Sequence, residues 1–149
     1  MVMNDNNYVI FKVNDLYCAL SCLEVQEIIR DTDHITPIPQ ADESISGVIN
    51  IRGKIVSVLN LPTHFKLDFN KADSDSIIVV NDEDECVGLY VSEVIDVIDL
   101  SGTEIEHTPA VPHKLDPHYV KGVMEFNKEI TAVLNLKEIL NVESAESEL

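Results

Sequence analysis

The sequence predicts a mainly β protein in which two small barrels share one apolar core. Three observations support this fold class. Val and Ile recur throughout the chain while aromatic residues make up only 5% of it, and β-branched residues favour strands. Short apolar segments alternate with turn residues, which is typical of small closed barrels. The same series of segments also occurs twice along the 149 residues.

The internal repeat appears as three matching pairs of segments in the same order. The pairs are residues 13–15 and 80–82, 20–29 and 89–98, and 47–61 and 122–136. They predict two structural copies, at about residues 8–66 and 76–141. A copy of about 60 residues buries little surface on its own. We therefore expect the two copies to share a core.

Each copy consists of short strands joined by turns. The expected strands are residues 9–13, 16–20, 27–29, 54–59, 86–91, 95–98 and 129–134. The Asn-Asp pairs at 14–15 and 81–82 suit tight turns, because both residues tolerate the left-handed conformation. Asn60 and Asn135 can each cap a following helix. Glu138 completes a capping-box spacing after Asn135, which predicts a short C-terminal helix.

The final strand of each copy is apolar at nearly every position. Such strands are buried on both faces. We expect six of these side chains in the core: Ile55, Val58, Leu59, Ile130, Val133 and Leu134. Residues 142–149 are expected to form a polar tail.

The charge of the chain limits the classes of partner. Ten Lys and Arg stand against 27 Asp and Glu, for a formal net charge of −17. Such a surface repels nucleic-acid phosphates and anionic lipids over about 8 Å in physiological salt. No segment approaches the roughly 20 apolar residues of a membrane-spanning helix, and residues 1–7 do not resemble a signal peptide. We expect a cytoplasmic protein that binds no nucleic acid and inserts into no membrane.

The sequence contains no recognisable catalytic or metal-binding pattern. His34, His64, His107, His113 and His118 form no H-E-x-x-H motif. Residues 82–85 lack the alternating ligands and the glycine of a calcium loop. Cys18, Cys22 and Cys86 lack C-x-x-C spacing, so we expect buried, reduced thiols. The chain is therefore predicted to be no enzyme and to hold no metal or cofactor.

Two segments resemble the CheW family of chemotaxis coupling proteins. They are Val25-Gln26-Glu27-Ile28 and Gly47-Val48-Ile49-Asn50-Ile51-Arg52-Gly53-Lys54-Ile55-Val56. The resemblance covers residues 8–141 as a single CheW-like domain. It implies two five-stranded SH3-like barrels with a hydrophobic core between them. It also implies a non-catalytic adaptor that binds the cytoplasmic tip of chemoreceptors and the regulatory domain of the histidine kinase CheA, at arrays beneath the inner membrane.

The resemblance also implies a receptor-binding groove. The positions associated with it are Val25, Glu27, Gly47, Arg52 and Gly53, with Val94 on the opposite wall. No kinase-binding surface is assigned. Residues two apart in an extended strand share a face, so we expect Val25 and Glu27 on the same side. The tight turn at residues 52–53 does not require an arginine, because the matching turn of the second copy has Asn127 instead of Arg52. The Arg52 guanidinium is therefore free to bind carboxylates or helix-end carbonyls.

The sequence departs from the family pattern at Asp42, Ser44, Ser57 and Asn60. Asp42 and Ser44 are expected to border the groove, so they bear on the choice of receptor more than on the fold. Two alternatives stay open. One is a CheW-like paralogue that serves a different receptor-kinase pathway, such as one controlling pili or development. The other is a small metal-dependent hydrolase that uses the loop histidines.

Overall fold

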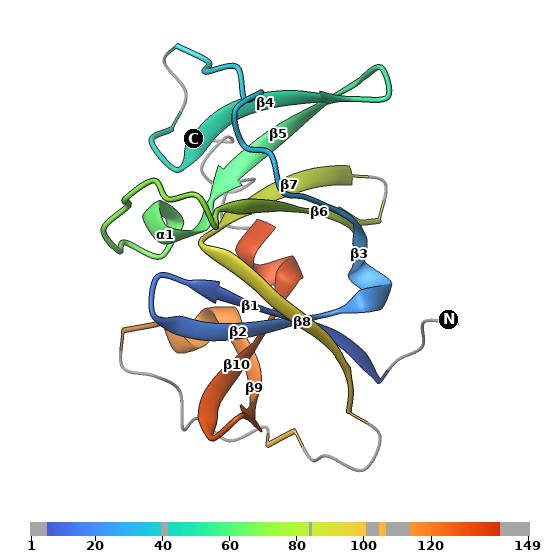
Figure 1. The fold of residues 1–149 in the computed structure, drawn as a ribbon, viewed down its shortest axis with the longest axis vertical. Coiled ribbons are helices and arrows are strands. Elements are labelled where there is room, and N and C mark those ends of the chain that lie inside the picture. Colours follow the sequence, from blue (N-terminus) through green and yellow to red (C-terminus); the bar gives the residue numbers. More distant parts are fainter. Residues whose placement is uncertain (1–5, 40–41, 84, 101–104, 107–113, 141–149) are drawn as a thin grey trace.

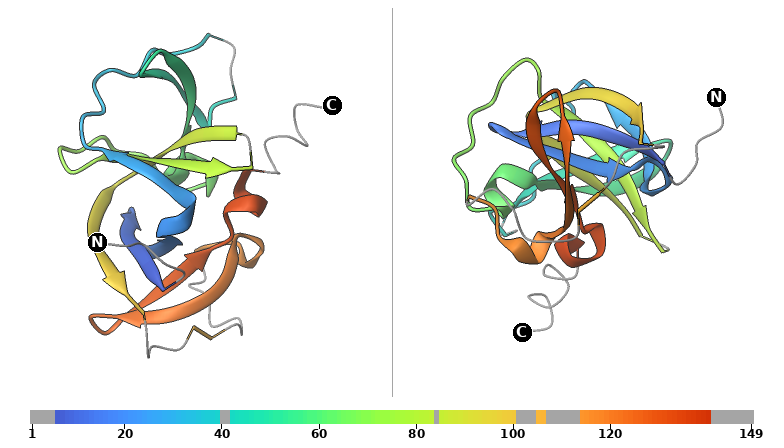
Figure 2. Two further views of the ribbon diagram at one scale, coloured as in Figure 1. Left: turned by 90° about the vertical axis from the view of Figure 1, so that its right-hand side faces the viewer. Right: turned by 90° about the horizontal axis from the view of Figure 1, so that it is seen from below.

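The structure, a computed structural model, contains two curved β-sheets that lie one above the other (Figures 1 and 2). It describes residues 6–39, 42–83, 85–100, 105–106 and 114–140. The expected polar tail lies outside these ranges, as do His107 and His113. Within the described ranges, no helix is long and apolar enough to cross a membrane.

Sheet A has five strands in the spatial order β8-β1-β2-β10-β9. The strands are β1 (Asn7–Val13), β2 (Leu16–Ser21), β8 (Glu93–Asp99), β9 (Val120–Phe126) and β10 (Glu129–Leu134). Neighbouring strands are antiparallel except β2 and β10, which run parallel. Sheet A forms the lower part of the molecule in Figure 1.

Sheet B has the equivalent order β3-β6-β7-β5-β4. Its strands are β3 (Val25–Ile29), β4 (Ile45–Ile51), β5 (Lys54–Asn60), β6 (Ser76–Asp82) and β7 (Glu85–Val91). Here β5 and β7 form the parallel pair. The helical elements are short: η1 (Cys22–Glu24), α1 (Leu61–His64), η2 (Pro117–Tyr119) and a helical segment over residues 136–140.

The two sequence copies exchange their first two strands. Strands β1 and β2 of the first copy belong to sheet A with β8, β9 and β10, while β6 and β7 of the second copy lie between β3 and β5 in sheet B. The expectation of two five-stranded units is confirmed, but neither unit corresponds to one copy. The two edge strands of each sheet are not paired with each other, so neither sheet closes into a barrel. The duplication extends to two isolated bridges, Thr36 with Val48 and Glu106 with Val123.

Three apolar clusters fill the molecule, and the largest lies between the sheets. This central cluster comprises Val9, Phe11, Val13, Cys18, Leu20, Cys22, Leu59, Leu61, Phe65, Ile78, Val80, Val87, Leu89, Val91, Val94, Leu115, Ala132, Leu134, Leu136, Ile139 and Leu140. A smaller sheet B cluster comprises Ile49, Ile51, Val56, Val58, Ile77, Val79 and Tyr90. The sheet A cluster comprises Tyr8, Ile10, Ala19, Leu100, Met124 and Val133. Burying each large aliphatic side chain stabilises the fold by roughly 1.5–3 kcal/mol.

Alternate residues of one strand contribute to different clusters. In β6, Ile78 and Val80 belong to the central cluster, while Ile77 and Val79 belong to the sheet B cluster. Successive side chains of a strand point to opposite faces, so β6 packs against one cluster on each of its faces. The shared apolar core predicted from the sequence is therefore confirmed.

Two of the six expected core residues are exposed. Val58, Leu59, Val133 and Leu134 are fully buried, as predicted. Ile55 and Ile130, at equivalent positions of the two copies, are 66% and 58% exposed. That part of the prediction is wrong. The β4–β5 hairpin and the β9–β10 hairpin each extend beyond the rest of their sheet. The parallel pairing of β5 with β7 begins only at Ser57, and that of β10 with β2 only at Thr131.

The helix caps follow the sequence prediction. The side-chain oxygen of Asn60 accepts a hydrogen bond from the Thr63 N–H at 3.0 Å, at the start of α1. Asn135 does the same for the Glu138 N–H at 3.2 Å, where the C-terminal helical segment begins. Each cap satisfies a backbone donor that the first helical turn leaves unpaired. The expected short C-terminal helix is thus present at residues 136–140.

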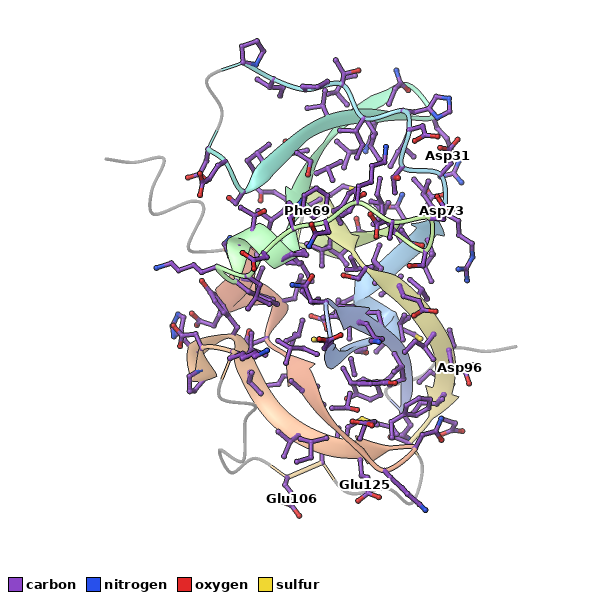
Figure 3. The ribbon with its side chains drawn as sticks, turned by 60° about the vertical axis from the view of Figure 1, so that its left-hand side comes forward. Asp31, Phe69, Asp73, Asp96, Glu106 and Glu125 are labelled. Atoms are coloured by element: carbon purple, nitrogen blue, oxygen red, sulfur yellow. The ribbon has the colours of Figure 1, made fainter. Side chains whose placement is uncertain are left out.

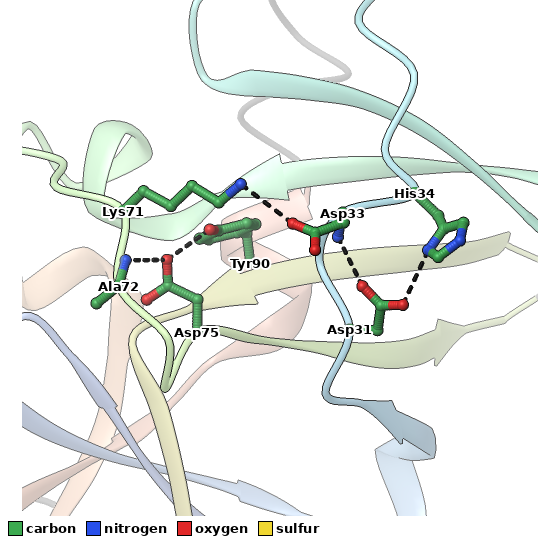
Figure 4. Close-up of polar contacts among 7 residues, drawn as sticks. All are labelled: Asp31, Asp33, His34, Lys71, Ala72, Asp75 and Tyr90. Carbon is green, nitrogen blue, oxygen red and sulfur yellow. Dashed lines mark hydrogen bonds and ion pairs between the residues drawn. The ribbon is translucent and has the colours of Figure 1, made fainter.

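The connection between α1 and β6 is tethered to sheet B by polar contacts (Figure 4). The Tyr90 hydroxyl donates to the Asp75 carboxylate at 2.5 Å, and the same carboxylate accepts from the Ala72 N–H at 3.0 Å. Burial and the Asp75 carboxylate raise the pKa of Tyr90 to about 12. Lys71 forms an exposed ion pair with Asp33 at 3.2 Å. The tether holds the crossing between the two copies in place.

Exposed acidic side chains occur on both sheets and on the connecting segments. Figure 3 shows carboxylates from both sheets and from the connecting segments at the periphery of the molecule. The acidic residues labelled there are Asp31, Asp73, Asp96, Glu106 and Glu125, all exposed. Exposed charges of one sign favour solubility and add repulsion towards anionic partners. A cluster of positive side chains is therefore unusual on this protein.

Candidate partner-binding site

Strand β3 is an edge strand of sheet B and carries two of the predicted site residues. Val25 pairs with Val80 and packs against the central cluster. Glu27 pairs with Val79, which belongs to the sheet B cluster on the opposite face. A shift in register at Gln26 inserts one extra residue between them. The expectation that Val25 and Glu27 share a face is therefore wrong, because a β-bulge reverses the alternation of side chains.

Strand β8 is the corresponding edge strand of sheet A. Val94 pairs with Phe11, and both are buried in the central cluster. Val97 pairs with Val9 of the same cluster but is 40% exposed. Val25 and Val94 thus pack on one cluster from the edge strands of the two sheets. The sequence prediction placed these two residues on opposite walls of a groove, and this stays a prediction.

Arg52 extends from the turn between β4 and β5 and forms a bidentate contact with Glu27. Its two terminal nitrogens donate to the two carboxylate oxygens at 3.0 and 3.3 Å. The Arg52 side chain is 74% exposed, so the pair adds under about 1 kcal/mol to stability. The fork does fix the orientation of the guanidinium, whose remaining N–H donors stay accessible.

The backbone of this turn distinguishes Arg52 from its counterpart. Arg52 and Gly53 have φ values of +50° and +85°, and Asn127 and Lys128 have +49° and +67°. Both turns thus need two successive left-handed residues. Asn and Gly adopt this conformation readily, whereas other L-residues do so at a cost of roughly 1–2 kcal/mol. Arg52 therefore occupies a position that Asn127 fills with less strain.

Gly47 is required by the backbone. Its φ is +146°, and an added Cβ would overlap the carbonyl oxygen of Thr36 and approach Ile35 Cγ2 to 2.9 Å. Thr36 and Val48 bond each other's backbone at 2.8 and 2.9 Å, so the segment before β4 cannot move away freely. Gly47 therefore holds this bridge close to β4.

Gly47→Ala is expected to destabilise the fold by more than about 3 kcal/mol, because it adds a steric overlap to an unfavourable φ. Gly53→Ala is the matched control. It also has a positive φ, but nothing lies within 4 Å of its added Cβ, so a loss of about 1 kcal/mol is expected. Urea unfolding of both variants measures the difference. Equal losses would show that Gly47 needs only its backbone freedom.

Asp42 and Ser44 lie away from Arg52, at the other end of β4. The Asp42 carboxylate accepts from the Ser44 N–H at 2.9 Å, and the Ser44 carbonyl accepts from the Asn60 N–H at 2.6 Å. They therefore close the start of β4 against α1. The expectation that they border the groove stays a prediction. Ser57, a third departure, is exposed on β5.

The described histidines and cysteines form no reactive constellation. His34 pairs with Asp31 at 2.9 Å, and His118 with Glu138 at 2.7 Å. Within the described part of the chain, no three His, Cys, Asp or Glu side chains are placed to hold a metal ion. The buried cysteines are in the central cluster, and desolvation raises the pKa of Cys18 to about 12. A thiol with so high a pKa stays protonated and unreactive at neutral pH.

His64 is the half-buried histidine at the end of α1. Its ring packs on Tyr119, with the centroids 5.4 Å apart. Burial lowers the pKa of His64, and this outweighs the nearby charge of Asp42 and a backbone hydrogen bond to Ile139, which both raise it. The unfolded chain, with an ordinary histidine pKa of about 6.5, therefore binds protons before the folded chain does.

The stability of the protein is thus expected to fall as the pH drops below about 6.5 towards the folded-state pKa of His64, and to be unaffected by this group at higher pH. His64→Gln should reduce the loss of unfolding free energy between about pH 7.5 and 5.5. His34→Gln, at an 82% exposed side chain, serves as the control. Denaturant titrations at both pH values test this. Identical pH dependence in wild type and His64→Gln would contradict the assignment.

The sequence reasoning missed Lys54. This residue follows the Arg52-Gly53 turn and lines a pocket with Arg52 and Gln26. The repeat contains a signal for it, because the position equivalent to Lys54 in the second copy is Glu129. The two turns therefore differ in charge although their backbones match.

Comparison with known proteins identifies the family. The model of the CheW-like domain matches residues 7–146. The chain belongs to the CheW-like domain family. The chemotaxis protein CheW of Klebsiella aerogenes is 28% identical over 137 residues, which cover 91% of this chain and 82% of that protein. The CheW protein of Bacillus subtilis is 28% identical over 140 residues, covering 93% and 89%.

The fold agrees with a solved CheW structure. The crystal structure of the scaffolding protein TtCheW from Thermoanaerobacter tengcongensis matches with a TM-score of 0.79 and 30% identity, over 89% of this chain and 86% of that one. The chain is therefore a chemotaxis scaffold protein of the CheW type and not an enzyme. The roles of the individual CheW site residues stay predictions.

Proposed function

We propose that this CheW-type chain is a cytoplasmic adaptor that couples the tip of chemoreceptors to the regulatory domain of the kinase CheA. Family membership supports the general role. The single observation that carries the receptor site is Arg52, an exposed cation in a left-handed turn where the second copy has Asn127. Strained conformations concentrate at functional sites, where another requirement outweighs the local cost.

The proposed receptor surface combines apolar and charged contacts. Partly buried Val25 on β3 and half-exposed Val97 on β8 would supply apolar contacts from the two edge strands, and Val94, buried in the central cluster, would support them. Arg52, oriented by Glu27, supplies directed donors beside β3. A receptor tip is a helical hairpin, so its apolar face would pack on the valines. Carboxylates of the receptor hairpin, or unpaired backbone carbonyls at its turn, would accept hydrogen bonds from Arg52.

The proposal is tested by a bridging assay. The regulatory domain of CheA is immobilised, and a receptor hairpin fragment is passed over it with and without this chain. Retention of the fragment only in the presence of the chain is the expected result. The same assay with the kinase and receptor of a pilus or developmental pathway tests the paralogue alternative. Binding to neither partner of the chemotaxis pair would overturn the proposal.

A further inference from the structure

A pocket of about 290 Å³ lies next to Arg52 and is not accounted for by the apolar receptor surface. It opens between the β4–β5 turn and the β6–β7 turn. Ile51 and Val56 form its apolar part, and both belong to the sheet B cluster. Arg52 and Lys54 contribute two cations to its lining. We call this the Arg52–Lys54 pocket.

The pocket lining contains two cationic side chains close together, which is unusual for this acidic chain. Two of only ten Lys and Arg residues line it, in a protein of net charge −17; Arg52 is already paired with Glu27, so Lys54 supplies the cation that remains available. Lys54 forms no ion pair among the residues that the structure describes. Among the described residues of the lining, Glu83 is acidic, and its carboxylate lies 3.8 Å from the Lys137 ammonium, which partly neutralises it. The equivalent positions in the second copy are Asn127 and Glu129, so the turn itself does not require the cations.

The shape and chemistry of the lining favour one class of occupant. The amide groups of Gln26 and Asn81 add hydrogen-bonding groups to the two cations, while Ile51 and Val56 provide an apolar wall. A glutamate side chain has methylenes that can contact such a wall and a carboxylate that can bridge two cations. Charge-assisted hydrogen bonds of this kind are roughly twice as strong as neutral ones.

We propose that the Arg52–Lys54 pocket receives a glutamate side chain of the receptor hairpin, with Lys54 as the second cation that binds its carboxylate. This rests on the proposed function, because it names the chemistry of the partner at the same site. Lys54 is then a specificity-determining residue. It selects receptors that carry an acid at the position facing the β4–β5 turn.

The test is a set of titrations with a receptor hairpin fragment. Lys54→Glu is expected to weaken binding by about 10-fold or more, because it replaces an attractive charge pair with a repulsive one. Lys128→Glu makes the same change in charge at the matching turn of the second copy and is expected to change affinity less than about 2-fold. Thermal melts of both variants establish that each is folded.

A double-mutant cycle identifies the receptor residue. Each glutamate of the fragment is changed in turn to glutamine and titrated against the wild type and Lys54→Gln. At one position, the change from glutamate to glutamine is expected to weaken binding of the fragment to the wild type. The same change should have little effect on binding to Lys54→Gln. Lys54→Glu binding like the wild type, or the absence of any coupled glutamate, would overturn the pocket assignment. If Arg52→Glu still weakened binding in that case, the proposed receptor site would stand.

Discussion

Arg52→Glu is expected to weaken binding of a receptor hairpin fragment by at least about 30-fold. Losing a directed charged contact at an interface costs about 2 kcal/mol or more, and the reversed charge adds repulsion. The fold should survive, because Arg52 lies at an exposed turn and its ion pair with Glu27 is worth little. Calorimetric titrations against the fragment and against the regulatory domain of CheA measure the two affinities.

Arg52→Asn is a second test that separates receptor binding from stability, because this variant should bind the receptor more weakly without losing stability. It introduces an Asn-Gly sequence into a turn with two left-handed residues, which is the most favourable sequence for this turn type. The variant should be at least as stable as the wild type, with a gain of up to about 1 kcal/mol, yet it should bind the receptor fragment weakly. Lys128→Gly relieves the same strain in the second copy and should leave binding unchanged.

The outcomes of these variants distinguish a binding role from a structural one. Unchanged receptor affinity of Arg52→Glu would contradict the assignment of Arg52 to the receptor site. An equal loss of affinity towards both partners, together with a lower melting temperature, would show that Arg52 supports the fold instead. A less stable Arg52→Asn would show that the ion pair with Glu27 outweighs the backbone strain.

Neither half of the chain is expected to fold alone, whereas an equimolar mixture of both halves should fold. A fragment of residues 1–69 would retain β3, β4 and β5 but would lack β6 and β7, which lie between β3 and β5 in sheet B. The fragment would therefore have only isolated hairpins, and two-stranded hairpins are marginal in water. Residues 70–149 would lack β1 and β2 of sheet A in the same way.

Circular dichroism and thermal melts of each fragment and of the mixture test this prediction. The matched control is the full chain cleaved after folding in the connection between α1 and β6, which should stay folded because both sheets remain complete. A cooperative thermal transition in either isolated fragment would contradict the exchange of strands between the copies.

Local features of the fold could be predicted from the sequence because they depend on neighbouring residues. The caps at Asn60 and Asn135 and the turn at 52–53 follow from side-chain and backbone chemistry within a few positions. The burial of Val58 and Val133 followed from continuous apolar strands. The repeat also indicated two similar units with a shared core.

The remaining features depend on contacts between distant segments. Exposure of Ile55 follows from where β7 begins to pair with β5, and no local pattern encodes that register. The bulge at Gln26 has no glycine or proline to indicate it, so Val25 and Glu27 were expected on one face. The exchange of strands was likewise hidden, because the repeat shows which segments are equivalent but not which of them pair.

The parallel pairing of β2 with β10 also constrains how the protein is made. Thr131 lies opposite Tyr17, so β2 pairs with a strand that is synthesised after all five strands of sheet B. Until then β1 and β2 form an apolar hairpin whose inner edge is open. Exposed strand edges promote association between chains. We infer that the acidic charge of the nascent chain helps to keep it monomeric until β10 emerges.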